Sequence, residues 1–413
     1  MKFRMDELVQ VIATALDVVE EEILGASTNH GKRIAILCAA MGRYLGMDED
    51  ALSTLTTCAM FHDNALTEYL MEEYDMGSVS KRSQNLPNRH CVYGQDNVDE
   101  LPLPDSTAGL ILYHHEHADG SGPFGKREGE FPLGAELIAI ADTIDVNYHL
   151  QRTSPEQLPD LVAEIRAASG TLFTARAVEA LTHVLDETLL SSLRDERIRE
   201  TAKTTIPAWE VEPGDQVLLR IADFVARIID YKSCFTRKHT LEIAILSCMM
   251  SEYYSFLPEK RDMIYLACAL HDIGKLYVPN EILEKPGPLT DEEFTRIKEH
   301  VQYTDTLLKD IHGFEQICTW AGNHHEKLDG SGYPHGKLEP DLDFVSRLIA
   351  CLDIYQAVSE ERPYHPGRTH EETMPIMYEM VQNGKIDRQI TEDIDKVLSG
   401  YPGSEKQDMK ILE

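Results

Sequence analysis

Long apolar runs are absent from this sequence of 413 residues. No stretch approaches the about 18 to 20 uninterrupted apolar residues that a bilayer-spanning helix needs. The N-terminal stretch is amphipathic, and its acids Asp6, Glu7 and Asp17 exclude the apolar centre of a signal peptide. We therefore expect no membrane partner and a cytoplasmic location.

Paired cysteines are also absent. The eight cysteines are Cys38, Cys58, Cys91, Cys234, Cys248, Cys268, Cys318 and Cys351, and no two of them form a CxxC motif. Several lie in apolar helical stretches, where a thiol behaves as a small buried hydrophobe. This distribution argues against a disulfide scaffold and against a zinc site built on cysteine.

Basic residues are few, with 39 Lys and Arg against 71 Asp and Glu and a formal net charge of −32. Neutralising the phosphates of a polymer requires a basic surface, so this charge argues against nucleic-acid polymers and anionic membranes as partners. A small anionic substrate stays compatible with the charge if bound metal supplies a local positive field.

Histidines and aspartates are placed in two matching sets. The first set is His30, His62, Asp63, His90, His114, His115 and Asp142, and the second is His239, His271, Asp272, His300, His324, His325 and Asp353. Corresponding members are separated by 209 to 211 residues, and the spacings within the two sets agree to one residue. A tandem duplication is the simplest explanation.

Apolar residues recur at spacings of three and four, as in "LRIADFVARIID" and "DFVSRLIACLDIYQAV". Strand-like alternation is missing, so the periodicity predicts an all-α protein made of two tandem helical bundles. We place the first copy at residues 1–190, a polar linker at 191–214, and the second copy at 215–413.

An adjacent His-Asp pair offers an imidazole and a carboxylate at one point, and the carboxylate can bridge two metal ions. Ligands of this nitrogen and oxygen type suit iron, manganese or zinc. Two such ions about 3.5–4 Å apart convert a bridging water into hydroxide and stabilise a phosphoryl transition state.

The motifs "HDIGK" at His271, "HHEKLDGSGYP" at His324 and "DIYQAVSEERPY" at Asp353 resemble the HD-GYP family. Its members are bacterial phosphodiesterases of cyclic dinucleotides within the HD superfamily of metal-dependent phosphohydrolases. The resemblance covers about residues 230–370. It implies two HD-type helical domains, with only the His-Asp skeleton shared by the first half.

The resemblance also implies roles for individual residues. His239, His271, Asp272 and Asp353 would hold one divalent ion, and Asp272, His300, His324 and His325 the other, with iron or manganese expected. Lys275 would face the scissile phosphate, and Arg362 would grip a substrate phosphate with its guanidinium fork. Gly332, Tyr333 and Pro334 would shape the entrance and a partner surface.

Three positions depart from the family pattern. Phe235 stands where members with a third metal carry Glu, so we expect two ions in the second copy. Gln356 replaces a common Asp, and His365 replaces a Lys that often follows "RPY". These two changes leave the preferred dinucleotide open.

The first copy keeps all the ligand residues and loses the residues implied for substrate. Leu66 stands where the second copy has Lys275, Gly122-Pro123-Phe124 replaces Gly-Tyr-Pro, and no "RPY" follows Asp142. We therefore expect further metal in the first copy and catalysis in the second, with the first serving as a regulatory or dimerisation partner.

The resulting hypothesis is a metal-dependent phosphodiesterase that opens cyclic di-GMP to a linear dinucleotide or GMP through a hydroxide bridging two metals. One alternative is another phosphate ester, such as cyclic GMP-AMP or another nucleotide. The other is a module that senses a dinucleotide or docks signalling proteins without turnover. A homodimer is compatible with each of them.

Overall fold

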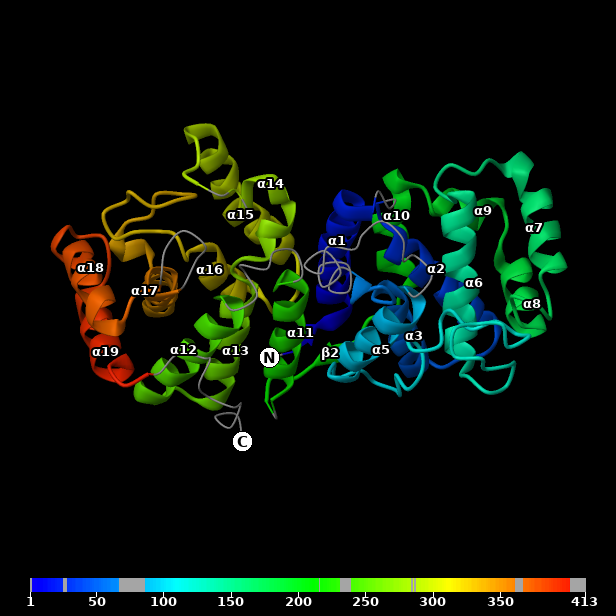
Figure 1. Cartoon of the computed structure of the whole chain (residues 1–413), viewed down its shortest axis with the longest axis horizontal. Helices are drawn as coiled ribbons and strands as arrows, with labels where there is room; N and C mark the ends of the chain where they lie inside the picture. The colour runs from blue at the N-terminus through cyan, green and yellow to red at the C-terminus, as the bar shows by residue number, and fades with distance from the viewer. Residues whose placement is uncertain are drawn as a thin grey trace. The chain divides into compact units, whose positions relative to one another are not determined.

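The structure is a computed structural model, and it describes residues 2–24, 28–66, 86–214, 216–230, 239–283, 285, 287–360 and 367–401 (Figure 1). Among these residues the only sheet pairs the two-residue strands β1 (Phe3–Arg4) and β2 (Glu210–Val211). All other regular structure is helical, and the all-α prediction is confirmed.

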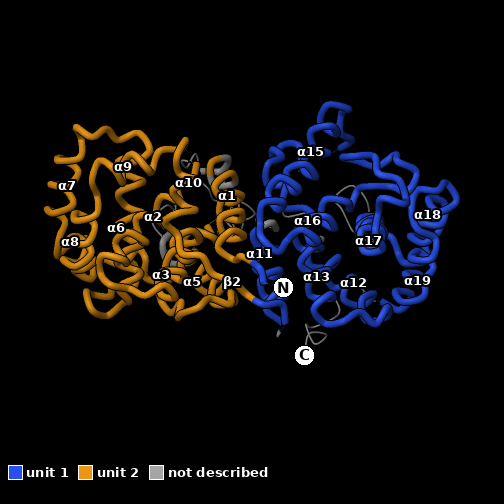
Figure 2. Tube along the Cα trace, turned by 180° about the vertical axis from the view of Figure 1, so that it is seen from behind, with its two compact units in different colours: residues 1–3, 212–413 blue, residues 4–211 orange. Residues whose placement is uncertain are grey.

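The chain divides into two compact units (Figure 2). One unit contains residues 4–211, and the other contains residues 1–3 and 212–413. Residues 191–211, which the sequence assigns to a linker, are counted with the first unit because helix α10 buries Ile198 and Ala202 against it.

The unit of residues 4–211 is drawn in orange in Figure 2, whose key numbers it unit 2. It comes first along the chain and is called the first unit below, and it is built around helix α2. Its helices are α1 (Met5–Leu24), α2 (His30–Tyr44), α3 (Glu49–Met60), α5 (Leu86–Asp99), α6 (Leu133–Tyr148), η1 (Pro155–Gln157), α7 (Leu158–Ala167), α8 (Ala175–Val184), α9 (Glu187–Ser192) and α10 (Asp195–Thr205). Helix α2 packs against α3, α6, α8 and α10, and residues 30–39 of it are buried throughout. A helix buried on all sides forms the centre of a bundle rather than its surface.

The other unit, called the second unit below, repeats this order. Its helices are α11 (Val217–Asp230), α12 (His239–Tyr253), α13 (Pro258–Leu270), η2 (Ile273–Tyr277), α14 (Asn280–Leu283), α15 (Asp291–Leu308), α16 (Glu315–Gly322), η3 (Glu339–Asp341), α17 (Phe344–Ser359), α18 (His370–Gln382) and α19 (Arg388–Leu398). Helix α13 packs against α11, α12 and α16, and α12 also packs against α17.

The duplication is visible in the element boundaries. Helices α2 and α12 are each 15 residues long and begin at a histidine of the matching sets. Helices α6 and α17 are each 16 residues long and carry Asp142 and Asp353 at the tenth position. Helix α16 is an exception, because the equivalent residues of the first unit form turns with Gly109 at φ 77°.

Capping residues determine where the helices that carry His300 and Asp353 begin. Helix α15 starts with a capping box in which Thr290 and Glu293 each accept the other's backbone N–H. Helix α17 starts at Asp343, whose carboxylate accepts from the Ser346 N–H at 2.7 Å. No helix within the described residues combines the length and apolar character needed to cross a membrane.

Candidate metal centres

In the second unit, the structure brings six of the seven predicted ligands together around Asp272. His271 ends α13, Asp272 follows it, His300 lies on α15, His324 and His325 follow α16, and Asp353 lies on α17. The carboxylate of Asp272 faces two directions, with Oδ2 3.1 Å from Nε2 of His271 and Oδ1 3.3 Å from Nε2 of His300. Asp353 lies 3.3 Å from Nδ1 of His325.

Three histidines of this cluster are aimed by their own helices. The Nδ1 atoms of His271, His300 and His324 donate to the carbonyls three residues earlier, at 2.5, 2.6 and 2.6 Å. The bond leaves Nε2 as the nitrogen whose lone pair can bind a metal ion, and it turns that nitrogen toward the cluster.

This arrangement fits divalent cations. Nε2 of His300 and Nε2 of His324 lie 3.2 Å apart, and both face the Asp272 carboxylate. Two neutral imidazoles whose Nδ1 atoms donate present lone pairs to one another, which is favourable only with a cation among them. The ligand atoms of His300, His324 and His325 lie within 4.8 Å of one another, as do those of His271, Asp272 and His324.

The electrostatics of the second unit favour uncharged His300 and His324, whereas burial opposes protonation of His271 but the neighbouring Asp272 raises its pKa. Burial lowers the pKa of His300 to about 3, and the charge of Lys275 acts in the same direction. Burial and the neighbouring His325 hold the pKa of His324 well below its ordinary value. Burial opposes ionisation of Asp353, but contact with His325 holds the pKa of Asp353 below its usual range. Neutral imidazoles and an ionised carboxylate are the forms that bind a metal ion.

Lys275 stands beside the cluster in the structure. It lies on η2, and its ammonium group is 2.5 Å from Oδ2 of Asp272. The preceding Gly274 lets η2 lie close to α15, because a Cβ at this position would lie 1.9 Å from the carbonyl oxygen of His300. The role of this glycine is therefore close packing of η2 on α15.

The Gly-Tyr-Pro segment covers one side of the cluster. The ring of Tyr333 lies 4.7 Å from the ring of His325, and its N–H donates to the His325 carbonyl at 3.2 Å. A Cβ at Gly332 would lie 2.5 Å from Cα of Glu326, so the loop closes tightly only with glycine there.

Glu326 is a residue that the sequence analysis missed. Its buried carboxylate accepts from the N–H groups of His335 at 2.7 Å and Lys337 at 2.9 Å, which ties the loop of residues 326–337. In the first unit, Glu116 accepts in the same way from the N–H groups of Phe124 and Lys126. The signal was the repetition of this Glu in both copies of the "HHE" motif.

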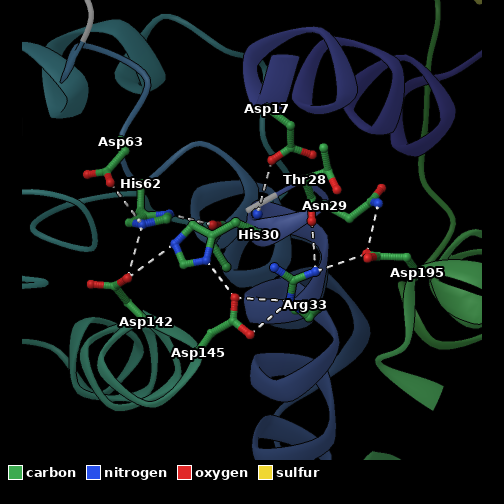
Figure 3. Close-up of polar contacts among 12 residues, drawn as sticks. Asp17, Thr28, Asn29, His30, Arg33, His62, Asp63, Asp142, Asp145 and Asp195 are labelled. Carbon is green, nitrogen blue, oxygen red and sulfur yellow. Dashed lines mark hydrogen bonds and ion pairs between the residues drawn. The ribbon is translucent and has the colours of Figure 1, made fainter. Parts of the chain in front are cut away.

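In the first unit, all seven predicted ligands meet. His30 and His62 point Nε2 at Oδ1 of Asp142, at 3.2 and 3.7 Å (Figure 3). On the other side, Oδ1 of Asp63 lies 3.3 Å from Nε2 of His90 and 3.7 Å from Nε2 of His114. The ligand atoms of His90, Cys91, His114 and His115 lie within 4.8 Å of one another.

This cluster also fits cations. Nε2 of His62, Nε2 of His114 and Oδ1 of Asp63 are buried and make no hydrogen bond among the described residues. A buried polar atom without a hydrogen bond costs free energy unless an ion or a water molecule binds it.

Two features distinguish the first cluster electrostatically. Burial opposes protonation, but the carboxylates of Asp142 and Asp145 raise the pKa of His30 to about 10. Burial raises the pKa of the Cys91 thiol, but His114 and His90 beside it outweigh that effect and lower the pKa to about 7. A metal entering this cluster must therefore displace protons.

A buried network stands behind His30. Nδ1 of His30 lies 2.7 Å from Asp145, and the Asp145 carboxylate accepts from Nε of the fully buried Arg33 at 2.8 Å (Figure 3). Arg33 also reaches Asp195 on α10 at 3.3 Å. The equivalent positions of the second unit are Glu242 and Gln356, so the network has no sequence counterpart there.

The substrate residues are missing from the first cluster. Leu66 replaces Lys275, and Phe124 packs its ring edge-on against Tyr113 at 5.8 Å. Arg362, Phe235 and His365 lie outside the described residues. The backbone of His239 begins α12, and its side chain lies outside the part of the chain that is described.

A family model described as HD domain matches residues 18–168 and 223–390. The chain belongs to the HD domain family. Each matched range contains one complete His-Asp set, so the two HD domains are those of the two units.

Curated relatives support the narrower HD-GYP resemblance. The 3′3′-cGAMP-specific phosphodiesterases 1 and 3 of Vibrio cholerae are each 31% identical to this HD protein. The alignments cover 93% of this chain and 89% of the first relative, and 82% of this chain and 74% of the second. A cyclic di-GMP phosphodiesterase of Pseudomonas aeruginosa is 30% identical over 59% of this chain and 56% of its own length. The predicted family and the predicted enzyme class, a phosphodiesterase, are confirmed.

A solved structure confirms the fold. The crystal structure of a cyclic GMP-AMP specific phosphodiesterase of V. cholerae matches with a TM-score of 0.65 at 24% identity. The match covers 97% of this chain and 99% of that chain, so both HD domains have counterparts in one known structure.

Proposed function

We propose that the second unit cleaves a phosphodiester bond of a cyclic dinucleotide, with two divalent ions held on either side of Asp272. The observation that carries the proposal is the Asp272 carboxylate, whose two oxygens face different histidines at 3.1 and 3.3 Å. A carboxylate placed in this way can bridge two ions.

The ligand sets follow from the contacts and the family pattern. His239, His271, Asp272 and Asp353 would hold one ion, and Asp272, His300, His324 and His325 the other. Donors of nitrogen and oxygen suit iron or manganese. When bound, the two ions supply a nucleophilic water at neutral pH and neutralise charge on the phosphate.

The remaining residues act on the substrate. The Lys275 ammonium, 22% exposed and 2.5 Å from Asp272, would contact the phosphate and stabilise the charge that develops on it. Tyr333 would shape the entrance from its position against His325, together with Gly332 and Pro334. Arg362 would bind two oxygens of a substrate phosphate with its guanidinium fork.

The substrate we place first is 3′3′-cGAMP. It is supported by two relatives named for that specificity, each of which aligns with more than four fifths of this chain. Cyclic di-GMP, the substrate first expected from the sequence, is the second candidate, and it is supported by the P. aeruginosa relative. The replacements Gln356 and His365 are the residues that could separate the two.

The first unit would bind metal without turnover, because Leu66 offers no charge to a phosphate. A regulatory or dimerising role for this unit, and docking of signalling proteins at residues 332–334, stay predictions.

The test is a substrate panel with the full chain in the presence of manganese or ferrous iron. The proposal expects cleavage of 3′3′-cGAMP, slower cleavage of cyclic di-GMP, and loss of both in Asp272→Ala. No metal-dependent cleavage of either by the wild type would instead favour the non-catalytic sensing module.

A further inference from the structure

A sulfur atom lies at the metal cluster of the first unit. Cys91 follows His90 on α5 and is fully buried. Its Sγ is 3.5 Å from Nε2 of His90 and 3.9 Å from Nδ1 of His114. The ligand atoms of these three residues and of His115 lie within 4.8 Å of one another.

The second unit has no sulfur at this place. The equivalent position is Val301, which is buried on α15 beside His300. Within the described residues, the two candidate groups of the second unit contain only histidine and aspartate. The two units therefore offer different donor atoms at matching positions.

The distances agree with a shared ion. Zinc holds sulfur at about 2.3 Å and nitrogen at about 2.1 Å in tetrahedral geometry, which places the two donors about 3.6 Å apart. The Cys91 Sγ to His90 Nε2 distance is 3.5 Å, and Oδ1 of Asp63 lies 3.3 Å from the same nitrogen. The sulfur and this nitrogen can therefore share one ion without a change of backbone, and the Asp63 carboxylate lies beside the same nitrogen.

A thiol hydrogen bond to His90 would also give 3.5 Å. It would not satisfy Oδ1 of Asp63 or Nε2 of His114, which are buried in the same cluster and make no hydrogen bond among the described residues. An ion held by the thiolate and Nε2 of His90 would lie on the nitrogen that faces Oδ1 of Asp63 at 3.3 Å, and this oxygen in turn faces Nε2 of His114 at 3.7 Å.

We propose that the first unit binds a thiophilic divalent ion, zinc in particular, through the Cys91 thiolate and His90, with the remaining positions filled from Asp63, His114 and His115. Thiolate selects zinc over manganese, which prefers oxygen ligands. The two HD domains of this chain thus hold different metals. This inference concerns the first unit and does not depend on turnover by the second.

The test uses Co²⁺ as a spectroscopic probe in the metal-free full chain. Wild type is expected to develop a thiolate-to-cobalt charge-transfer band in the near ultraviolet, and added Zn²⁺ is expected to abolish it. Cys91→Val, which introduces the residue of the second unit, is expected to lose the band. Cys58→Ser, a buried thiol of the same unit, is the matched control and should keep it.

Zinc affinity gives a second readout. In Cys91→Val the zinc affinity should fall by about 100-fold or more. Loss of a residue that only hydrogen-bonds to a metal ligand already costs about 10–100-fold in affinity, and loss of a ligand should cost more. Should this variant fail to fold, thiol alkylation of the wild type decides instead, because bound zinc should slow modification of Cys91 by about tenfold or more.

Either of two results would overturn the inference. The first is a cobalt spectrum of the wild type without the thiolate band, or with a band that Cys91→Val retains. The second is an alkylation rate of Cys91 that zinc leaves unchanged.

Discussion

Lys275 and Leu66 stand at equivalent positions, three residues after the aspartate of each His-Asp pair. The lysine brings an ammonium group to 2.5 Å from the Asp272 carboxylate, while the leucine is aliphatic and uncharged. A phosphate that gains charge in the transition state is stabilised only by the former.

Replacing Lys275 should therefore separate catalysis from metal binding. In Lys275→Met, kcat/KM for the dinucleotide should fall by about 10²–10³-fold, with the metal content of the protein unchanged. Steady-state kinetics and metal analysis of the same preparation measure both. Leu66→Met, the matched control, should change neither, and a Lys275→Met enzyme with wild-type kcat/KM would remove this lysine from the mechanism.

At the scale of elements, the loop of residues 326–337 depends on one buried carboxylate. Glu326 accepts two backbone N–H groups and holds the loop in which Tyr333 contacts His325. Buried carboxylates with such charge-assisted bonds contribute more than neutral acceptors.

Glu326→Gln should weaken this loop, because the amide nitrogen cannot accept from a backbone N–H. Unfolding free energy should fall by about 1–3 kcal/mol, and kcat/KM by about tenfold or more as Tyr333 is displaced. Denaturant unfolding and kinetics are the measurements. Glu116→Gln in the first unit should lose similar stability and no kcat/KM, so equal kinetic losses in both variants would contradict the assignment.

Helices α2, α6 and α10 are joined by Arg33, which contacts Asp145 and Asp195. Removing the guanidinium takes a charged hydrogen-bond partner from the buried Asp145 carboxylate, which keeps its contact with His30, so Arg33→Met should lose about 1–3 kcal/mol of unfolding free energy. Asp195→Asn, at a side chain 49% exposed, should lose less than about 1 kcal/mol. Denaturant titration measures both, and a loss in Arg33→Met no larger than in Asp195→Asn would show that the network contributes little.

Across the whole molecule, the sequence predicted the fold well, and it indicated the two His-Asp sets as candidate ligands, because both recur. Helices beginning at His30 and His239 have equal lengths, and Asp142 and Asp353 occupy the same helical position. When the same spacing of histidines and aspartates occurs twice in one chain, it can be recognised from the sequence alone.

Features found in one unit only were not predictable in this way. The Arg33–Asp145 pair is separated by 112 residues and has no sequence counterpart in the second unit. Cys91 belongs to no cysteine motif, and only the fold places its sulfur beside His90 and His114. Glu326 was repeated, but its partners are backbone N–H groups, which carry no residue signature.

The two similar His-Asp clusters of this chain are expected to divide their roles, with catalysis in the second unit. The most direct test is dinucleotide turnover by two full-length variants, Asp272→Ala and Asp63→Ala, with manganese in excess. We expect Asp272→Ala to lower kcat by about 10³-fold or more and Asp63→Ala to lower it by less than about tenfold. Equal losses in the two variants, or a larger loss in Asp63→Ala, would contradict it.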